Sequence, residues 1–341
     1  MKPSSNLIAL VCLFLTWMAC DEPVNVTDVS GSDDLPVEYP CLYSSEDCTS
    51  LLYAKGGTFE FYSSFHIDSL SLVRGAIISV HGNTRNGNDY FDKMTSVVSG
   101  MGLRDDVMVI APKFITEYEK NNETDWYWST TSWKWGLESY SSPSGQTVSS
   151  FELVDSLLNR LSDKTLFPYI ENIVLTGHSS GAAFTHLLSS TKENNLYNDV
   201  NIEFAVVNNQ YFLHPDSIRM LQDGSFSILN NCGVYNKWPH GLDDLSPYME
   251  SIGKSIARSN FLSNRVLYFI GVNDTDSDGI TSGCQYENLG VNRFDKNVNY
   301  NIYMDSLHEN HNHEIVQIEN IGHTTNAFSS NIFTEYLNTI F

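Results

Sequence analysis

Short apolar runs alternate with amphipathic segments from about residue 57 to the C-terminus. Runs that are apolar on both faces are typical of buried parallel strands, and apolar residues three and four positions apart are typical of helices that cover a sheet. The apolar runs are residues 75–82, 106–114, 172–179, 202–210, 265–274 and 314–323, and the helix-like segments are residues 89–101, 149–163, 180–191 and 331–341. This alternation predicts an α/β fold with a mostly parallel central sheet flanked by helices.

Two segments depart from this alternation. Residues 58–65 alternate apolar and polar side chains, which predicts an antiparallel strand at the edge of the sheet. Residues 211–262 are longer than a plain crossover and include an amphipathic stretch at 245–262, so we expect part of this segment to form a small cap over the sheet. Ligands of such sheets bind beyond the carboxyl ends of the strands, and we therefore expect functional side chains in the loops that follow the apolar runs.

The first 20 residues predict an export signal. Lys2 precedes an apolar stretch, Leu7 to Trp17, that is too short to span a bilayer. The stretch ends at Ala19-Cys20, and a small residue before a cysteine resembles a bacterial lipoprotein signal in which Cys20 is acylated. Trp17 departs from the aliphatic residue usual at that position, which leaves plain secretion open.

The remaining chain is expected to divide into two parts. Residues 21–55 are polar and acidic and include the loop between Cys41 and Cys48, which predicts a tether. Residues 56–341 are expected to form the α/β domain, with the cap-like insertion at about 211–262. Export implies a periplasmic or extracellular protein, or an outer-membrane lipoprotein.

Four cysteines remain outside the signal, and an even number in an exported chain predicts disulfides. Cys41 and Cys48 enclose a short local loop and are the natural pair, which would leave Cys232 to pair with Cys284. Four cysteines allow three connectivities, so the sequence alone leaves the pairing open.

The charge of the chain excludes some partners. It has 41 acidic against 19 basic residues and a net charge of −22, whereas binding to nucleic acid needs clustered basic residues. We therefore expect no nucleic-acid partner and no membrane contact except through an N-terminal lipid anchor. We expect a small-molecule or acylated substrate and no cofactor, and the sequence leaves the oligomeric state open.

The strongest local motif is Gly177-His178-Ser179-Ser180-Gly181. A GxSxG pentapeptide is a weak signal of a nucleophile by itself. The alternative is a glycine-rich turn with a buried serine that has only a structural role. Here, however, the motif directly follows an apolar run and directly precedes a helix-like segment. That strand–turn–helix setting is what a nucleophile elbow requires, so we predict Ser179 as a nucleophile.

A serine hydroxyl needs a base to take its proton. His323 lies just past the last apolar run and before the final helix-like segment, where such a base is expected. A rival group, His308, His311 and His313, precedes that run and so falls at the other end of the sheet. We interpret the rival group as a solvated loop, with adventitious metal binding as the minor alternative.

The acid of a triad is expected after the penultimate strand, where Asp274 is the first carboxylate. The same stretch, DTDSDG, also matches the opening of a calcium loop that would use Asp276 and Asp278. The twelfth position of that loop is Gln285 instead of glutamate. We therefore predict Asp274 as the acid, and keep Asp276 or Asp278 as the acid, and a calcium site, as alternatives.

An oxyanion hole needs two backbone N–H groups aimed at the developing charge. One is expected from Ser180, which follows the nucleophile, and the other from Asn83, in the turn after the first long apolar run. His81 and Gly82 end that run, and His-Gly at a strand end recurs in esterases and lipases. An ordinary polar turn is the alternative.

A tryptophan-rich segment at residues 125–136 follows the apolar run that ends in APKF. Clustered aromatic side chains at the active edge of a sheet commonly form a pocket wall. Together with His81, the predicted substrate-binding residues are Trp126, Trp128, Trp133 and Trp135. The alternative is that the segment folds back and its tryptophans pack on the core.

Several blocks of the sequence resemble a largely unassigned group of α/β-hydrolase proteins from bacteria and fungi. These blocks are HGNTRNGNDYF, VIAPKF, DWYWS with SWKWG, GHSSGAAF, CGVYNKWPHGL and IENIGHTTNAF, in that order. The resemblance runs from about residue 57 to the C-terminus. It implies the α/β-hydrolase fold, and the family's nucleophile, acid and histidine correspond to Ser179, Asp274 and His323. It implies no substrate.

These observations predict a serine hydrolase that cleaves carboxylic esters through a Ser-His-Asp triad and an acyl-enzyme. A peptidase or amidase with the same triad is one alternative. A non-catalytic surface protein that binds carbohydrate or a partner through the tryptophan-rich segment is another.

Overall fold

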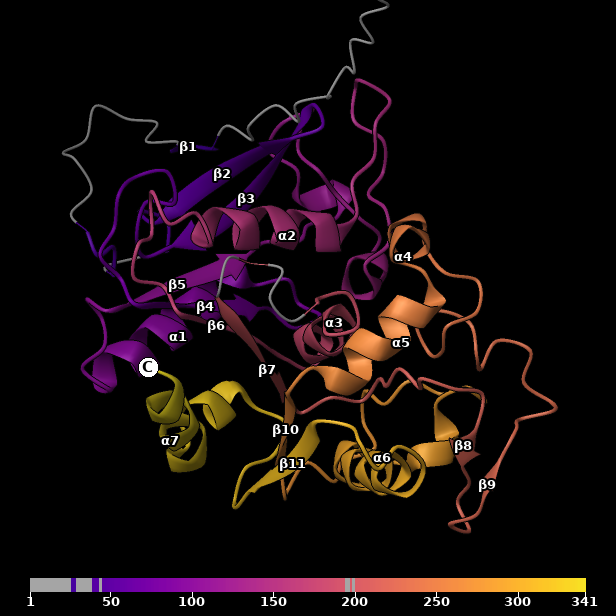
Figure 1. The fold of residues 1–341 in the computed structure, drawn as a ribbon. Helices are drawn as coiled ribbons and strands as arrows, with labels where there is room; N and C mark the ends of the chain where they lie inside the picture. Colours follow the sequence, from indigo (N-terminus) through magenta and orange to yellow (C-terminus); the bar gives the residue numbers. More distant parts are fainter. Residues whose placement is uncertain (1–25, 29–38, 43–44, 194–196, 198–199) are drawn as a thin grey trace, which may run out of the picture.

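The structure is a computed structural model that describes residues 26–28, 39–42, 45–193, 197 and 200–341. The predicted signal, with Cys20, lies outside these residues. The described strands build one large sheet in the order β1-β2-β3-β5-β4-β6-β7-β10-β11 (Figure 1). Their bounds are β1 Val26–Asp28, β2 Thr49–Ala54, β3 Gly57–Ser63, β4 Gly75–Val80, β5 Val107–Pro112, β6 Asn172–His178, β7 Asn201–Val207, β10 Val266–Gly271 and β11 His313–Ile318.

The sheet is mostly parallel, as predicted. Every pairing from β5 through β4, β6, β7 and β10 to β11 is parallel. Strands β4, β5 and β10 are buried at every residue, which explains why their sequences are apolar on both faces.

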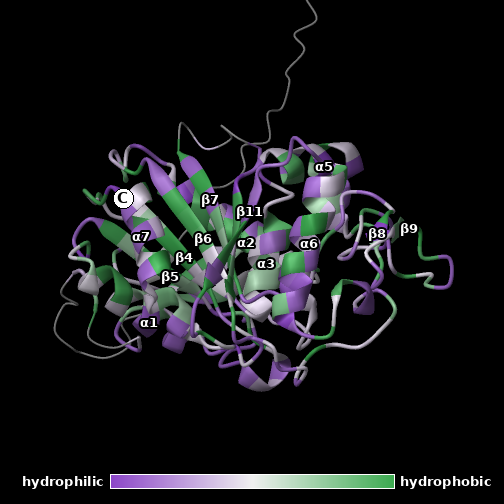
Figure 2. Cartoon of the chain, turned by 90° about the horizontal axis from the view of Figure 1, so that it is seen from below, coloured by the Kyte–Doolittle hydropathy of each residue, from purple (hydrophilic) through white to green (hydrophobic). Residues whose placement is uncertain are grey.

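Helices cover both faces of the sheet. They are α1 Gly87–Gly100, α2 Ser150–Leu161, α3 Ser180–Leu188, α4 Pro247–Ile252, α5 Lys254–Ser263, α6 Arg293–Leu307 and α7 Asn331–Ile340. Buried side chains of α1 and α7 pack in one hydrophobic cluster, and those of α2, α3, α5 and α6 pack in the other. Figure 2 shows the apolar strands between these two layers. No helix of the described part of the chain is both long and apolar enough to cross a membrane.

The sheet begins earlier in the chain than the sequence predicts. β3 is antiparallel to β5, but it is not an edge strand, because β2 pairs with its other side and β1 pairs with β2. A two-residue turn joins β2 to β3, and both of its residues, Lys55 and Gly56, have positive φ angles of 48° and 76°. Such a turn matches the twist of a hairpin. The folded domain therefore includes residues that we assigned to the tether.

Two helical features differ from the predicted pattern. The amphipathic stretch at 245–262 forms two helices, α4 and α5, because Gly253 between them has a φ of 85° that breaks the helix. Helix α6 was not predicted, since its sequence is rich in Asn and Asp, which are weak helix formers. The Asn292 side chain caps it by accepting a hydrogen bond of 2.8 Å from the Asp295 N–H.

The cap-like insertion lies along the helices on one side of the sheet. Besides α4 and α5 it contains a two-stranded ribbon, β8 (Arg219–Met220) and β9 (Phe226–Ser227). In Figures 1 and 2 this ribbon lies at the outer side of α6. The insertion is joined to the loop after β10 by the Cys232–Cys284 disulfide, and Cys41–Cys48 forms the second disulfide. Both predicted pairings are therefore confirmed.

The rival histidine group is not a solvated loop. His308 and His313 are buried, and His308 lies 3.2 Å from Asp216. The Nε2 of His313 donates to the carbonyl of Phe261 at 2.6 Å, and its Nδ1 accepts from Tyr268. These two rings therefore pack inside the domain near the amino end of β11, where polar partners satisfy their nitrogens.

Burial of neutral imidazoles predicts that acid destabilises the protein. Burial lowers the pKa of His81 to about 4 and that of His313 to about 3, from the ordinary value of 6.5. The unfolded chain therefore binds more protons between those values, and stability falls as the pH falls through this window. Each such histidine is expected to cost about 2 kcal/mol between pH 7 and pH 5.

The measurement is the urea midpoint and its slope between pH 7.5 and pH 5. His313→Gln should make stability less dependent on pH than it is in wild type, because one histidine that is buried in its neutral form has been removed. A urea midpoint that is flat from pH 7.5 to pH 5 would contradict this prediction.

Candidate active site

Ser179 stands at the sharp turn between β6 and α3. Its φ and ψ are 60° and −114°, a region that costs energy for a residue with a side chain. A Cβ on Gly177 would lie 2.4 Å from the backbone of Gly181, and a Cβ on Gly181 would lie 2.1 Å from the carbonyl oxygen of Val80. Glycine is therefore required at position 177 for β6 and α3 to approach each other, and at position 181 for α3 to approach the end of β4.

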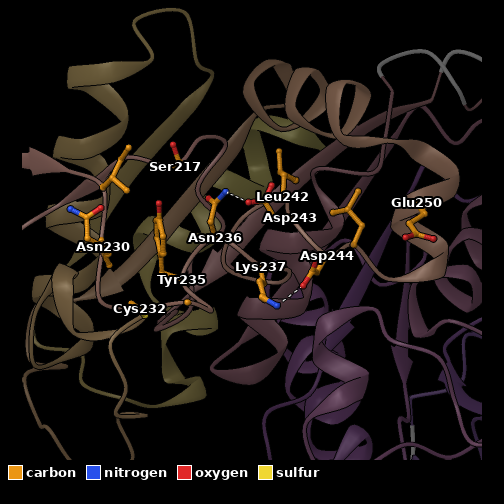
Figure 3. A pocket seen from close by; sticks show the side chains of 14 residues that line it. Ser217, Asn230, Cys232, Tyr235, Asn236, Lys237, Leu242, Asp243, Asp244 and Glu250 are labelled. Carbon is orange, nitrogen blue, oxygen red and sulfur yellow. Dashed lines mark hydrogen bonds and ion pairs between the residues drawn. The ribbon is translucent and has the colours of Figure 1, made fainter.

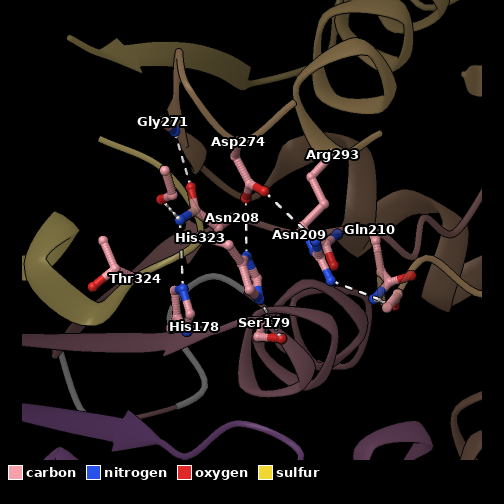
Figure 4. Close-up of polar contacts among 12 residues, drawn as sticks. His178, Ser179, Asn208, Asn209, Gln210, Gly271, Asp274, Arg293, His323 and Thr324 are labelled. Atoms are coloured by element: carbon pink, nitrogen blue, oxygen red, sulfur yellow. Dashed lines mark hydrogen bonds and ion pairs between the residues drawn. The ribbon is translucent and has the colours of Figure 1, made fainter. Parts of the chain in front are cut away.

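The three predicted catalytic side chains lie in one hydrogen-bonded line (Figure 4). His323 Nε2 is 3.0 Å from Ser179 Oγ, and His323 Nδ1 is 2.9 Å from Asp274 Oδ2. A carboxylate can only accept a hydrogen bond, so Nδ1 carries the imidazole proton and Nε2 is left to accept from the serine. This arrangement can remove the serine proton and stabilise the imidazolium that results.

Each of these side chains follows the carboxyl end of a parallel strand. Ser179 follows β6, Asp274 follows β10 and His323 follows β11. The strands are neighbours or near neighbours in the sheet, in the order β6-β7-β10-β11. The parallel register brings their carboxyl ends to one edge, which is why residues so far apart in sequence meet.

Arg293 supports the acid, and sequence reasoning missed it. Asp274 is 1% exposed, and Arg293 Nη1 lies 3.5 Å from its Oδ1, the oxygen that does not face His323. Arg293 is the first residue of α6, so the missed helix hid this partner. The guanidinium also lies 3.4 Å from the carbonyl of Gly279, which ties the loop after β10 to α6.

The geometry of the DTDSDG loop favours Asp274 over Asp276 and Asp278 as the acid, and a calcium site in this loop stays an alternative prediction. Asp276 and Asp278 are exposed, and Asp274 alone turns inward. Within the described ranges, no three His, Cys, Asp or Glu side chains gather as a metal site would require.

Asn208, directly after β7, holds the loop that carries the base, and no pattern in the sequence pointed to it. Its Nδ2 donates to the carbonyl of Gly322 at 3.0 Å, and its Oδ1 accepts from the N–H of Gly271 at 2.9 Å. It thus connects the ends of β7, β10 and β11. The residue before the nucleophile, His178, packs on His323 with ring centroids 4.6 Å apart. Burial holds the pKa of His178 well below its ordinary value, so a neutral ring faces the base.

The predicted oxyanion donors have backbone N–H groups that are free to act. Ser180 is the first residue of α3, and an N–H at that position has no acceptor inside its own helix. Asn83 follows β4, and its N–H donates to no residue in the described chain. The assignment of Asn83 and Ser180 to an oxyanion hole stays a prediction.

The prediction that the tryptophans contact substrate is wrong for Trp126, Trp128 and Trp133. Their exposed fractions are 2%, 1% and 0%, and all three belong to the hydrophobic core. The indole N–H groups of Trp126 and Trp128 donate to the carbonyls of Ala54 and Leu137, each at 3.0 Å. The segment folds back on the sheet because these large rings gain more from burial than from exposure.

His81 is also removed from the substrate-binding set. It is fully buried, its Nε2 accepts from the Phe114 N–H at 3.0 Å, and its ring packs 4.6 Å from Trp133. Trp135 is half-buried and meets Tyr211 edge to face. Trp135 is thus the tryptophan of this segment for which substrate binding stays a prediction.

A surface hollow in the insertion is separate from the triad. It is lined by polar side chains that include Tyr235, Lys237 and Glu250 (Figure 3). Of its charged groups, Lys237 Nζ pairs with Asp244 at 2.5 Å, and Asp243 pairs with Lys254, which lies outside the lining. No triad residue lines this hollow.

Comparison with known proteins gives the fold. No family model matches the sequence, and a search of curated proteins gave no match. Among solved structures, the chain is similar to LpqC, a poly(3-hydroxybutyrate) depolymerase from Bordetella parapertussis, with 16% identity, a TM-score of 0.59, and coverage of 85% of this chain and 90% of that one. It is also similar to poly(aspartic acid) hydrolase-1 from Sphingomonas sp. KT-1, with 15% identity, a TM-score of 0.58, and coverage of 86% and 97%. The strand order, the parallel pairings and these similarities together show that the chain has the α/β-hydrolase fold.

Proposed function

We propose that this protein is a serine hydrolase that cleaves carboxylic esters through an acyl-enzyme. The observation that carries the proposal is the line from Ser179 through His323 to Asp274, with distances of 3.0 and 2.9 Å. The strained backbone at Ser179 adds support, because such strain is found where a side chain must be presented for chemistry.

The chemistry follows from the positions of the protons. His323 takes the Ser179 proton while the oxygen attacks the ester carbonyl, and the N–H groups of Asn83 and Ser180 stabilise the oxyanion. The imidazolium then gives its proton to the leaving alcohol, and the acyl group stays on Ser179. In the second half, His323 activates a water that hydrolyses the acyl-enzyme.

Two alternatives, a peptidase or amidase and a non-catalytic binding protein, are compared with the esterase proposal. One neighbour is named as a depolymerase of poly(3-hydroxybutyrate) and the other as a hydrolase of poly(aspartic acid), which favours hydrolysis over mere binding. A peptidase or amidase would use the same triad and is an outcome of the test below. The non-catalytic alternative loses its basis, because three of the four tryptophans in the segment are buried.

We also propose that the protein acts after export. The two disulfides support an oxidising compartment, and the N-terminal sequence supports a signal, with Cys20 as the residue that would carry a lipid anchor. Metabolic labelling with a fatty-acid probe, comparing wild type with Cys20→Ser, distinguishes the anchored from the secreted form.

A fluorophosphonate probe tests the activity directly. We expect covalent labelling of the native protein at Ser179, located by mass spectrometry of the tryptic peptide, and no labelling after heat denaturation. Aryl esters and anilides with the same acyl group then separate the two enzyme classes, and we expect turnover of the esters. A native protein that resists the probe and hydrolyses neither series would overturn the proposal.

A further inference from the structure

The ammonium group of Lys134 is buried, and no carboxylate in the described part of the chain pairs with it. The side chain belongs to the 3₁₀ helix η2 (Ser132–Trp135), and the residue is 3% exposed. Within the described residues, its Nζ forms no hydrogen bond and no ion pair. It lies over the rings of Trp135 and Tyr211, 4.8 Å and 4.6 Å from their centroids. Burial lowers the pKa of Lys134 to about 8, so most of the population is still charged at pH 7.

The other buried lysines are partnered. Lys192 pairs with the carboxylate of Asp155, and Lys296 donates to the carbonyl of Tyr286 at 2.6 Å. Burial of a charge without a partner costs free energy, and two aromatic faces return only part of that cost. The Nζ atom has no partner among the described residues and is not among the unpartnered side-chain atoms that are sealed from solvent, so it keeps some solvent-accessible surface.

The segments around Lys134 adjoin the segments that carry the triad. Helix η2 packs against α3, whose first turn follows Ser179, and Trp133 beside Lys134 contacts His81 at the end of β4.

The second ring over which the ammonium lies, that of Tyr211, follows the end of β7, where the Val207 carbonyl accepts from the Ser179 N–H at 3.0 Å. The Tyr211 hydroxyl lies 2.5 Å from the hydroxyl of Thr281, in the loop that follows Asp274.

We propose that Lys134 binds a carboxylate on the substrate, so that the enzyme prefers esters that carry a negative charge. The aromatic rings of Trp135 and Tyr211 form the walls of this subsite, and the ammonium is the ligand of the anion. The proposal rests on the proposed esterase function. It assigns a cationic subsite to a protein with a net charge of −22, so the preference comes from one local group and not from the overall charge.

Matched ester pairs test the preference. On the acyl side the pair is 4-nitrophenyl hexanoate and the 4-nitrophenyl monoester of adipate, which differ by methyl against carboxylate. On the alcohol side the pair is the 3-methylphenyl and 3-carboxyphenyl esters of hexanoate. The measured quantity is the ratio of kcat/KM for the charged ester to kcat/KM for the neutral one. Lys134→Met should lower this ratio about 10- to 100-fold in one pair, the usual worth of a charge-assisted hydrogen bond, and Lys134→Arg should largely keep it.

A matched control is available in Lys120, whose ammonium also lies over a tyrosine ring, Tyr127, at 4.8 Å. Lys120→Met removes the same charge from the protein and should leave the ratio unchanged in both pairs. Lys134→Met should melt no lower than wild type, because it removes an unpaired buried charge. Lys134→Gln serves as a second neutral variant if the methionine variant does not fold.

Ratios that are the same in wild type and in the neutral Lys134 variants, in both pairs, would overturn the subsite. Failure of the esterase function itself is distinguishable, because no ester of either pair would then be hydrolysed. In that case calorimetric titration with adipate still decides: binding to wild type that is lost in Lys134→Met supports the subsite, and equal or absent binding rejects it.

Discussion

Ser179→Ala is expected to lower the turnover of aryl esters by about a millionfold, to the residual rate that the oxyanion donors and binding alone supply. The serine hydroxyl serves the chemistry, and its removal leaves the elbow backbone and the glycine contacts in place. The melting temperature should therefore remain close to that of wild type. The measurements are kcat with an aryl ester and thermal unfolding of the same preparation.

The matched control is Ser99→Ala, which removes an exposed hydroxyl from the last turn of α1 and should leave turnover unchanged. Substantial residual hydrolysis by the Ser179 variant, after contaminating esterases are excluded with the probe, would remove Ser179 as the nucleophile.

Asp274→Asn is expected to lower turnover by about ten-thousandfold, because an amide can hold the imidazole in the tautomer whose Nε2 cannot accept the serine proton. This variant should also melt at a lower temperature than wild type. Its neutral side chain leaves Arg293, which is nearly buried and 3.5 Å from the carboxylate, without a counter-charge.

Asp276→Asn and Asp278→Asn are the controls within the same loop. Both side chains are exposed, so turnover should stay close to wild type in each. Equal losses of activity in all three variants, together with a melting temperature that calcium raises in wild type only, would make the loop a metal site and reject Asp274 as the acid.

The three triad residues could be predicted from the sequence because they lie at the ends of strands in a parallel sheet. Buried parallel strands are apolar on both faces, so the runs that end at Ser179 and Asp274 were recognisable as strands. The run before His323 was recognisable from its Ile and Val residues, although β11 is only partly buried. Once the strands were located, the residues after their carboxyl ends were the candidates. The triad could be predicted because its members are placed by backbone topology alone.

The parts that were missed depend on packing between segments distant in sequence. Arg293 lies on a helix whose polar composition hid it, and Asn208 acts through backbone groups of two other strands. The burial of Trp133 depends on the space between α3 and the end of β4. Periodicity along one segment does not report such contacts, so a cluster of aromatic residues could be predicted, but not which way its rings face.

The order of the strands has a consequence for partly folded chains. β6 lies inside the sheet, whereas β11, which leads to His323, is the outermost described strand on its side and pairs only with β10. A folding intermediate in which β11 has not yet joined would present a strained serine with no base to activate it. Hydrolysis would thus begin only when β11 joins the sheet. The rate at which activity recovers during refolding would then measure the rate of this last step, and a partly folded molecule would hydrolyse no substrate.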